Sequence, residues 1–478
     1  MSTPTRFFAA AGLAALLAGC STTVGPDFTP PAPPTVQGYA MAGDAVPSTV
    51  ATLTPTERPA GAWWTALGSP ALDAVIAQAL KQNPTLAEAD ATLESARQDY
   101  IELDALHTPQ IEGTGAITRQ RINTSSFGFS GFASPTITLY QIGANVLYDL
   151  DLFGSGRRGR EAARARIDEE ARRADAAYLT LTGKVALEAV RIAALKSQIA
   201  AARAVLADGQ QTLEIARKAE EAGAEAPASL APGEAQVAAD RAQIPPLEAE
   251  LARARHALAL LVGQPSGAWT APEFDLASFT APARIPVSLP SELVRRRPDI
   301  LAAEAALHAA TADIGVETAK LYPSLRLAAG YNQGALDGRN IFNYDSSGWN
   351  FGPQLSVPLL DGGRRKAGRD SAVAEARAAD ARYRQTVLTA FTQVADALDA
   401  LGRDDELLAA RNAQVAAAQS SFDSARKAYD LGGGTLLAVV DAQRQLSRAR
   451  RDLAQSQGDR YAHVVQLFTA VAADWRTA

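Results

Sequence analysis

The chain has 478 residues and a formal net charge of −6, with 52 acidic and 46 basic side chains. Because cations are not in surplus, the composition gives no reason to expect nucleic acid as a partner. The single cysteine excludes an internal disulfide framework. Length alone suggests about three domains of roughly 150 residues each, but an internal repeat described below overrides that expectation.

Residues 1–19 have the features of a secretory signal peptide: a positive Arg6, then an apolar stretch. The ending Leu17-Ala18-Gly19-Cys20 resembles a bacterial lipobox, which implies cleavage before Cys20 and acylation of that residue with fatty acids such as palmitate. The alternative is an incidental cysteine in a leader. Ser21 follows in place of an aspartate, which favours the outer over the inner membrane. No later apolar run of about 18 residues predicts a transmembrane helix.

Residues 20–62 are rich in proline, threonine and alanine and only weakly patterned. This composition predicts an extended, lipid-anchored tether in front of the folded body. A helix is then expected from Pro70 to about Asn83, and a second from Pro84 to about His107. Pro109 ends the second helix.

After these helices the apolar period changes to two, as in the strands of a hairpin. The outward positions of this hairpin, on either side of a loop at 123–135, are Ile111, Gly113, Gly115, Ile117, Ile142, Ala144, Val146 and Tyr148. A long helix is predicted from about Gly156 to Ala222, and one returning helix up to about Val262. Residues 263–290 form a proline-rich connection.

Residues 291–478 repeat the plan of residues 63–262, which we take as the first repeat. The second hairpin has its apolar positions at Leu325, Leu327, Ala329, Tyr331, Trp349, Phe351, Leu355 and Val357. A second long helix is predicted from about Gly362 to Leu431. A turn of three glycines follows, and a last helix runs from Thr435 towards Ala472.

Both long helices carry an apolar residue at every seventh position, and the two rows correspond at one constant offset. The rows are Tyr178, Val185, Ile192, Ile199, Leu206 and Leu213, then Val387, Val394, Leu401, Leu408, Val415, Phe422 and Tyr429. A sustained seven-residue repeat keeps one seam of a helix against its neighbours and predicts coiled-coil packing.

The four strands have apolar residues on one face and small or polar residues on the other. Such strands either pack on a soluble core or face lipid, and the long helices that flank them favour lipid. Four strands cannot close a barrel, and open sheet edges are not tolerated in hydrocarbon, so several chains would have to share one barrel. Pro353 inside the last strand speaks mildly against this interpretation, because it removes one ladder donor.

Five phrases in order resemble the outer-membrane efflux proteins, specifically the TolC-like lipoprotein branch that serves resistance-nodulation-division (RND) pumps. They are Val24-Gly25-Pro26-Asp27-Phe28, Tyr148-Asp149-Leu150-Asp151-Leu152-Phe153-Gly154, Arg296-Arg297-Pro298-Asp299-Ile300, Leu360-Asp361-Gly362-Gly363-Arg364 and Asp441-Ala442-Gln443-Arg444. The resemblance covers the mature chain. It implies a mainly α homotrimer, with a shared twelve-stranded membrane β-barrel continuing into an α-helical coiled-coil tunnel.

Several motifs allow more than one interpretation. Gly154-Ser155-Gly156-Arg157-Arg158-Gly159 satisfies the dinucleotide fingerprint, but the following helix is too long for that unit. We expect Gly154, Gly156, Gly362 and Gly363 to serve strand-to-helix turns. Cations gather where both long helices begin, and they either meet lipid headgroups or are ordinary solvated or interchain-paired charges. They are Arg157, Arg158, Arg160, Arg364, Arg365 and Lys366.

The family resemblance also implies a periplasmic gate and an adaptor-binding end. Asp441 matches a ring carboxylate and Tyr429 its aromatic partner, although Asp441 as a solvated helix carboxylate is the alternative. Gly434, Ala438 and Ser229 depart from the residues that some members have, so the closed state is expected to be built differently here. Adaptor contacts are expected at the tips: Ala222, Gly223, Leu431 and Gly432.

The leading hypothesis is a passive outer-membrane exit duct of a tripartite efflux pump for drugs and other small toxic compounds. A periplasmic adaptor (membrane fusion protein) would open it, and an inner-membrane RND-type transporter would feed it. No enzyme activity, cofactor or metal is expected: His107, His256, His308 and His463 lack ligand spacing. Met41 is the only methionine after the signal peptide, which argues against soft-metal export. The alternatives are a periplasmic coiled-coil scaffold or adaptor lipoprotein and a type I protein secretion duct.

Overall fold

A computed structural model describes residues 23–36, 38–39, 41, 52–54, 62–128, 131, 133–223, 226–282, 284–287 and 290–471. These residues form two compact units, each described here by itself. The strand unit contains the described residues of Met1–Pro31, Thr92–Ala171 and Ala302–Arg384. The helix unit contains those of Ala32–Ala91, Arg172–Leu301 and Gln385–Ala478.

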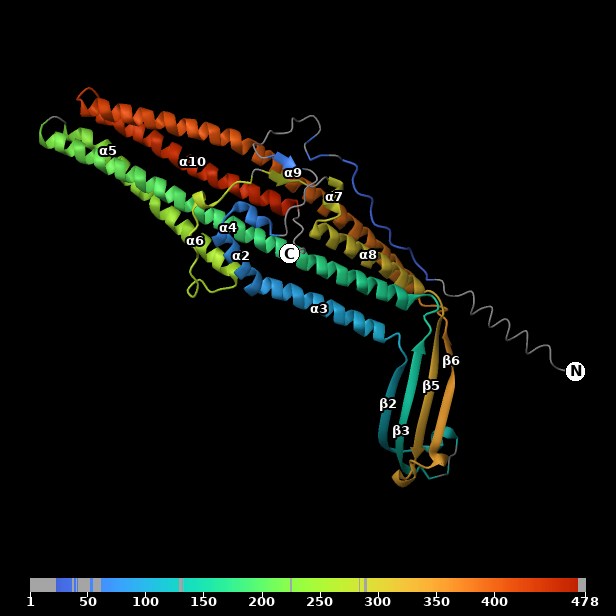
Figure 1. Cartoon of the computed structure of the whole chain (residues 1–478). Coiled ribbons are helices and arrows are strands. Elements are labelled where there is room, and N and C mark those ends of the chain that lie inside the picture. The colour runs from blue at the N-terminus through green and yellow to red at the C-terminus, as the bar shows by residue number, and fades with distance from the viewer. Residues whose placement is uncertain are drawn as a thin grey trace. The chain divides into compact units, whose positions relative to one another are not determined.

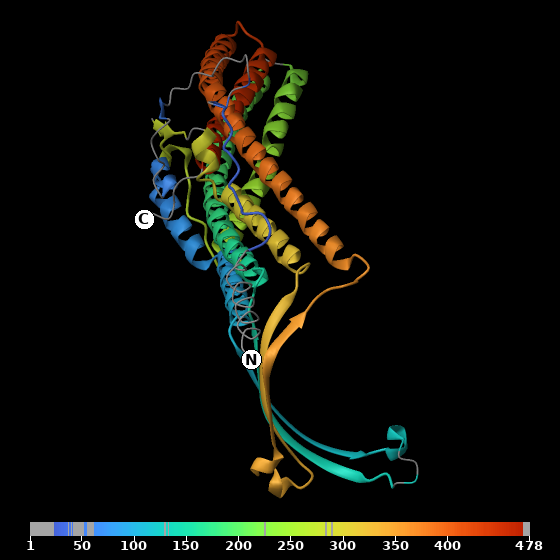
Figure 2. The same ribbon diagram turned by 90° about the vertical axis from the view of Figure 1, so that its right-hand side faces the viewer.

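The strand unit contains one four-stranded antiparallel sheet (Figure 1), with the order β2-β3-β5-β6. The strands are β2 (Gln110–Arg121), β3 (Thr136–Asp149), β5 (Ser324–Ala335) and β6 (Ser347–Ser356). The two repeats therefore meet at the pairing of β3 with β5, from Tyr140 opposite Ala335 to Asp149 opposite Arg326. Beyond this pairing the two hairpins diverge towards their loops, as Figure 2 shows.

The register places the predicted apolar positions of all four strands on one face. Val146 lies opposite Ile111 and Ala329, and Ala329 lies opposite Phe351. The residues of the next row belong to the other face: Glu112, Asn145, Gly330 and Asn350. The apolar face is open: Ile111, Ile117, Trp349 and Phe351 each expose more than two-thirds of their surface, at 74%, 72%, 77% and 71%.

The two long helices agree with the prediction to within about two residues. They are α4 (Ser155–Glu221) and α9 (Arg364–Asp430), and each has 67 residues. In α4 the seven-residue row includes Val185 and Ile192, which are fully buried, and in α9 it includes Val394, which is also fully buried. Among the described helices, none combines the length and apolar character that crossing a bilayer requires.

Shorter helices precede each hairpin. They are α2 (Pro70–Gln82) and α3 (Pro84–Ala105) in the first repeat, then α7 (Pro290–Val294) and α8 (Pro298–Ala319) in the second. Pro70 lies in the first turn of α2, where its missing N–H costs no hydrogen bond. The Asn83 side chain links α2 to the end of the returning helix by donating to Leu261 O at 2.7 Å.

The prediction of one uninterrupted returning helix in the first repeat is wrong. The segment divides into α5 (Pro227–Ala242) and α6 (Ile244–Val262), whereas the second repeat has the single helix α10 (Leu436–Ala470). Pro245 and Pro246 follow directly after the break. Proline lacks the N–H that would continue the α5 ladder, and its ring excludes the helical conformation of the preceding residue.

The predicted tether is not a free linker throughout. Within it, β1 (Thr52–Thr54) pairs in parallel with β4 (Arg284–Pro286) of the connection between the repeats. A second stretch, Thr23–Phe28, packs on helices of the strand unit and is described below. The predicted signal peptide and Cys20 lie outside the described residues.

Candidate functional site

Two aspartates cap the long helices where the strands end. Asp151 accepts hydrogen bonds from Gly156 N and Arg157 N at 2.8 and 2.9 Å. Asp361 does the same for Gly363 N and Arg365 N at 3.0 and 3.2 Å. A carboxylate satisfies the free N–H groups of a helix start and complements its dipole. Neither cap was predicted from the sequence, although an aspartate just before a helix is a recognisable signal.

The glycines predicted at these turns have two different roles. Gly154, Gly362 and Gly363 adopt positive φ angles of 76°, 66° and 86°, which other residues disfavour. Gly156 instead lies in α4, where an added Cβ would stand 2.0 Å from the ring of His107. Its role is therefore to allow close approach of that imidazole.

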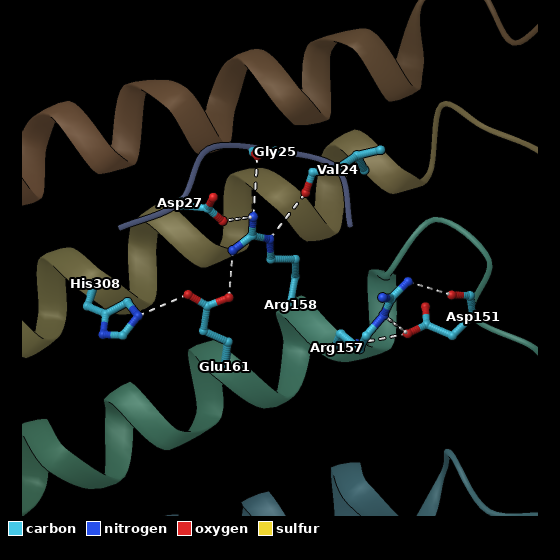
Figure 3. A network of polar contacts seen from close by, with 8 residues as sticks. All are labelled: Val24, Gly25, Asp27, Asp151, Arg157, Arg158, Glu161 and His308. Atoms are coloured by element: carbon cyan, nitrogen blue, oxygen red, sulfur yellow. Dashed lines mark hydrogen bonds and ion pairs between the residues drawn. The ribbon is translucent and has the colours of Figure 1, made fainter. Parts of the chain in front are cut away.

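Arg158 forms the centre of a polar network at the first turn of α4 (Figure 3), and its side chain is only 5% exposed. The guanidinium donates to Val24 O at 3.2 Å and to Gly25 O at 3.3 Å. It also pairs with Asp27 at 2.6 Å and with Glu161 at 2.7 Å. Three of its partners thus come from the chain that follows the predicted acylation site.

Glu161 extends this network to α8. Its second carboxylate oxygen lies 3.0 Å from His308 Nε2, and the ring of His308 stacks on Phe28 with centroids 4.4 Å apart. Burial raises the pKa of Glu161, but the hydrogen bonds and charges of Arg158 and His308 outweigh burial and hold that pKa below its ordinary value.

These contacts correct one expectation about the cations at the start of α4. Arg158 neither contacts a lipid headgroup nor is solvated, because its buried guanidinium pairs with groups inside the strand unit. Arg157 and Arg160 also have partners in the chain, Asp151 at 3.6 Å and Asp104 at 3.1 Å. Arg364 and Lys366 at the start of α9 are exposed, and a lipid contact there stays a prediction.

Arg297, from the phrase before α8, joins three helices of the helix unit. Its Nε donates to both carboxylate oxygens of Asp299 at 2.8 and 3.1 Å. Its Nη1 donates to Ala470 O at 3.1 Å and to Ala390 O at 3.5 Å, and its Nη2 donates to Gln393. Arg297 is 8% exposed, so this residue ties the start of α8 to α9 and to the end of α10.

The helix tips are the turns at which α4 leads into α5 and α9 leads into α10. Gly223 and Gly432 end α4 and α9 with φ of 75° each, as glycines after helices commonly do. Ala222 and Leu431 lie one residue earlier, and Leu431 is 77% exposed. Tyr429 packs against both apolar clusters of this region, so it joins α9 and α10 to Ala216 of α4.

Asp441 lies on α10 between two buried residues and is itself 53% exposed. Its carboxylate pairs with Arg444 on the same helix at 3.4 Å. Arg444 also donates through Nε to Gln236 of α5 at 3.0 Å. The carboxylate predicted for the gate is therefore connected, through one arginine, to the returning helix of the first repeat.

The buried part of this network was not predicted from the sequence. Gln236 donates to Asp240 at 2.8 Å, and Gln443 donates to Asp240 at 3.4 Å and to Val205 O at 3.3 Å. Burial raises the pKa of Asp240. The hydrogen bond from Gln236 and the charges of nearby arginines lower this pKa, but burial has the larger effect. Gln443 lies 203 positions from Asp240 in the chain, so no local pattern pairs these two residues.

His463 of α10 pairs with a buried carboxylate of α9. Its Nδ1 lies 2.7 Å from Asp404 Oδ2, and Asp404 is 6% exposed. The hydrogen bond to Asp404 raises the pKa of His463, against burial, which lowers it. The ion pair therefore stabilises the fold at pH values below the imidazole's ordinary pKa, and this stability is lost as the pH rises through the raised value.

We expect His463→Gln to lower the melting temperature more at about pH 6 than at about pH 9, because the charged pair exists only below the raised pKa. Thermal melts of purified protein at both pH values measure this difference. His256→Gln is the control, since His256 is exposed on α6. A loss equal at both pH values would show that the imidazole contributes by packing and not by charge.

Comparisons with known proteins agree with this architecture. The outer membrane efflux protein family model matches residues 75–264 and 289–473. The cation efflux system protein CusC of Escherichia coli O6:H1 is 30% identical, over 97% of this chain and 98% of that protein. The pyoverdine export outer membrane protein OpmQ of Pseudomonas aeruginosa is also 30% identical, over 97% and 95%.

The structure of the outer-membrane channel OprN superposes with a TM-score of 0.85 at 28% identity, covering 95% of this chain and 99% of that one. The fold is thus that of the TolC-like efflux channels, with a duplicated arrangement of helix, hairpin, long helix and returning helix. The family match spans most of both repeats. The chain belongs to the outer membrane efflux protein family.

Proposed function

We propose that the protein is a homotrimeric exit duct through which small toxic molecules leave the periplasm across the outer membrane. The observation that carries this proposal is the four-stranded sheet, with one apolar, open face and β2 and β6 as its edge strands. In hydrocarbon each edge needs a partner strand. Three chains would supply twelve strands and leave no edge.

Charge on the helices of the strand unit supports assembly with further copies. α3 presents the exposed carboxylates Glu94, Asp99 and Glu102. Ile101 of the same helix and Leu106, directly after its end, are 56% and 58% exposed. The first turns of α9 present exposed cations: Arg364, Lys366 and Arg377. An acidic helix that also exposes apolar side chains fits against a basic helix of another copy.

The partners follow from the same proposal. A periplasmic adaptor would contact the tips at Ala222, Gly223, Leu431 and Gly432, and an inner-membrane RND-type transporter would supply the energy. Acylation of Cys20 would anchor the chain to outer-membrane lipid. The duct would be neither an enzyme nor a cofactor protein. By their names, the relatives described above export a cation and pyoverdine. Family membership therefore does not identify the exported molecule, and the inner-membrane transporter would select it.

The periplasmic gate is proposed at Asp441, with Tyr429 supporting the turn beside it. Three exposed carboxylates around one axis would attract cations and repel each other. We expect Asp441→Ala to give larger or more frequent channel openings and weaker cation selectivity. Single-channel conductance of the purified protein in planar bilayers measures both quantities.

Asp399→Ala is the matched control for the gate. Asp399 lies on α9, is 52% exposed and pairs with Arg403 one helical turn away, much as Asp441 is 53% exposed and pairs with Arg444. Channel openings that are unaffected by Asp441→Ala would support the duct proposal and contradict the assignment of Asp441 to the gate. Folded wild-type protein that never inserts would favour the periplasmic scaffold, and export of a protein substrate would favour the type I secretion duct.

A further inference from the structure

The phrase Val24-Gly25-Pro26-Asp27-Phe28 has no part in the duct or gate described so far. In the structure the stretch Thr23–Phe28, here called the strap, packs against α4 and α8 of the strand unit. Val24 N donates to Phe153 O at 3.2 Å, in the turn that leads from β3 to α4. An added Cβ on Gly154 in that turn would stand only 3.0 Å from Thr23.

Two glycines allow the strap to reach the backbone of α8. A Cβ on Gly25 would stand 2.4 Å from Gly315 Cα, and a Cβ on Gly315 would stand 2.6 Å from Arg158 Cγ. Gly25 also has a φ of 93°. This close packing of main chain on main chain requires glycine on both sides, so the strap lies in a site shaped for it.

Arg158 fixes the strap in this site with charge. The Arg158 side chain is almost fully buried, whereas the Asp27 side chain is 92% exposed. Arg158 also donates to Val24 O and Gly25 O. Glu161 holds the guanidinium from the side of α4, and Phe28 stacks on His308 of α8. Figure 3 shows that the strap residues and Glu161 approach the guanidinium from different sides.

We propose that the strap is a built-in positioning site for the lipid anchor, with Arg158 as its positioning residue. This inference rests on the proposed acylation of Cys20. Thr23 is three positions after Cys20, which allows a reach of at most about 11 Å. The acyl chains would therefore enter the bilayer beside the β3–α4 junction, and the anchor would set the depth at which the strands meet the membrane.

The test uses a spin label on the full-length protein in outer-membrane lipid vesicles. Cys20 is the only cysteine and its thiol would be blocked by the attached lipid, so Thr29→Cys, at an exposed position, gives a single free thiol. We expect a restricted label in the parent protein and at least a several-fold shorter rotational correlation time after Arg158→Gln. Arg166→Gln is the control, because it removes the exposed Arg166–Asp313 pair between the same helices.

Asp27→Asn and Gly315→Ala keep the test decisive if Arg158→Gln fails to fold. Asp27→Asn removes the charge of the exposed partner of Arg158. The added Cβ of Gly315→Ala would clash with Arg158 and Val24 O. Both substitutions should therefore free the label in folded protein. A label that is mobile in the parent protein, or restricted in all three variants, would overturn the strap. Channel conductance of the parent is measured separately, so a failure of the duct proposal is distinguishable from a failure of the strap.

Discussion

Arg297→Ala lowers the free energy of unfolding by at least about 2 kcal/mol, since buried acceptors that lose their donor cost about 1–3 kcal/mol each. The substitution removes the donor that Ala390 O and Ala470 O share, and it removes the ion pair with Asp299. The end of α10 then loses its connection to the start of α8. We expect a clearly lower apparent melting temperature and less mature protein in the membrane.

Arg296→Ala provides a matched control for this prediction. Arg296 is the preceding residue, its side chain is 31% exposed, and its ion pair is with Glu292 at 3.5 Å on the same turn. Exposed pairs of this kind contribute about 0–1 kcal/mol. Melts of both variants at the same scan rate measure the difference, and equal melting temperatures would show that the interior of the helix unit does not depend on Arg297.

Gly263→Ala is expected to destabilise the helix unit by roughly 3 kcal/mol, from a left-handed backbone and a steric clash together. Gly263 ends α6 with a φ of 78°, and its added Cβ would stand 2.4 Å from Gln82 O and 3.0 Å from Gln82 C. The Gln82 carbonyl lies at the corner between α2 and α3, where Asn83 binds Leu261 O. Neither backbone segment can move without breaking this corner.

The control is Gly267→Ala in the same connection. No atom lies within 4 Å of its added Cβ, so we expect a change within about 0.5 kcal/mol. Thermal melts of the two alanine variants measure both effects. A Gly263→Ala protein as stable as Gly267→Ala would mean that the corner yields at little cost.

Periodicity made most of the fold predictable from the sequence. The seven-residue rows of α4 and α9 are a local signal that repeats over many turns, and both helices end within about two residues of the expected positions. The strand faces followed from the alternation in the same way. The division of α5 from α6 was not predicted, although Pro245-Pro246 is a local signal for a helix break.

The long-range polar contacts were not predictable from any local pattern. Arg158 and Asp27 lie 131 positions apart, and Gln443 and Asp240 lie 203 positions apart. A basic residue at the first turn of a helix is unfavourable by itself, so the sequence alone suggested an exposed or lipid-facing arginine. The approach of the strap, with its carbonyl groups and its carboxylate, together with Glu161 of α4, makes burial of that charge favourable.

The equal length of α4 and α9 restricts how the chain can evolve. Each has 67 residues, and the 16 and 19 residues of α5 and α6 together match the 35 of α10. An insertion of fewer than seven residues in one helix would rotate its apolar row away from its neighbours. A whole heptad would add about 10 Å to that helix alone. Insertions and deletions are therefore tolerable in the loops and the connection, whereas a longer or shorter tunnel requires matched changes in all four segments at once.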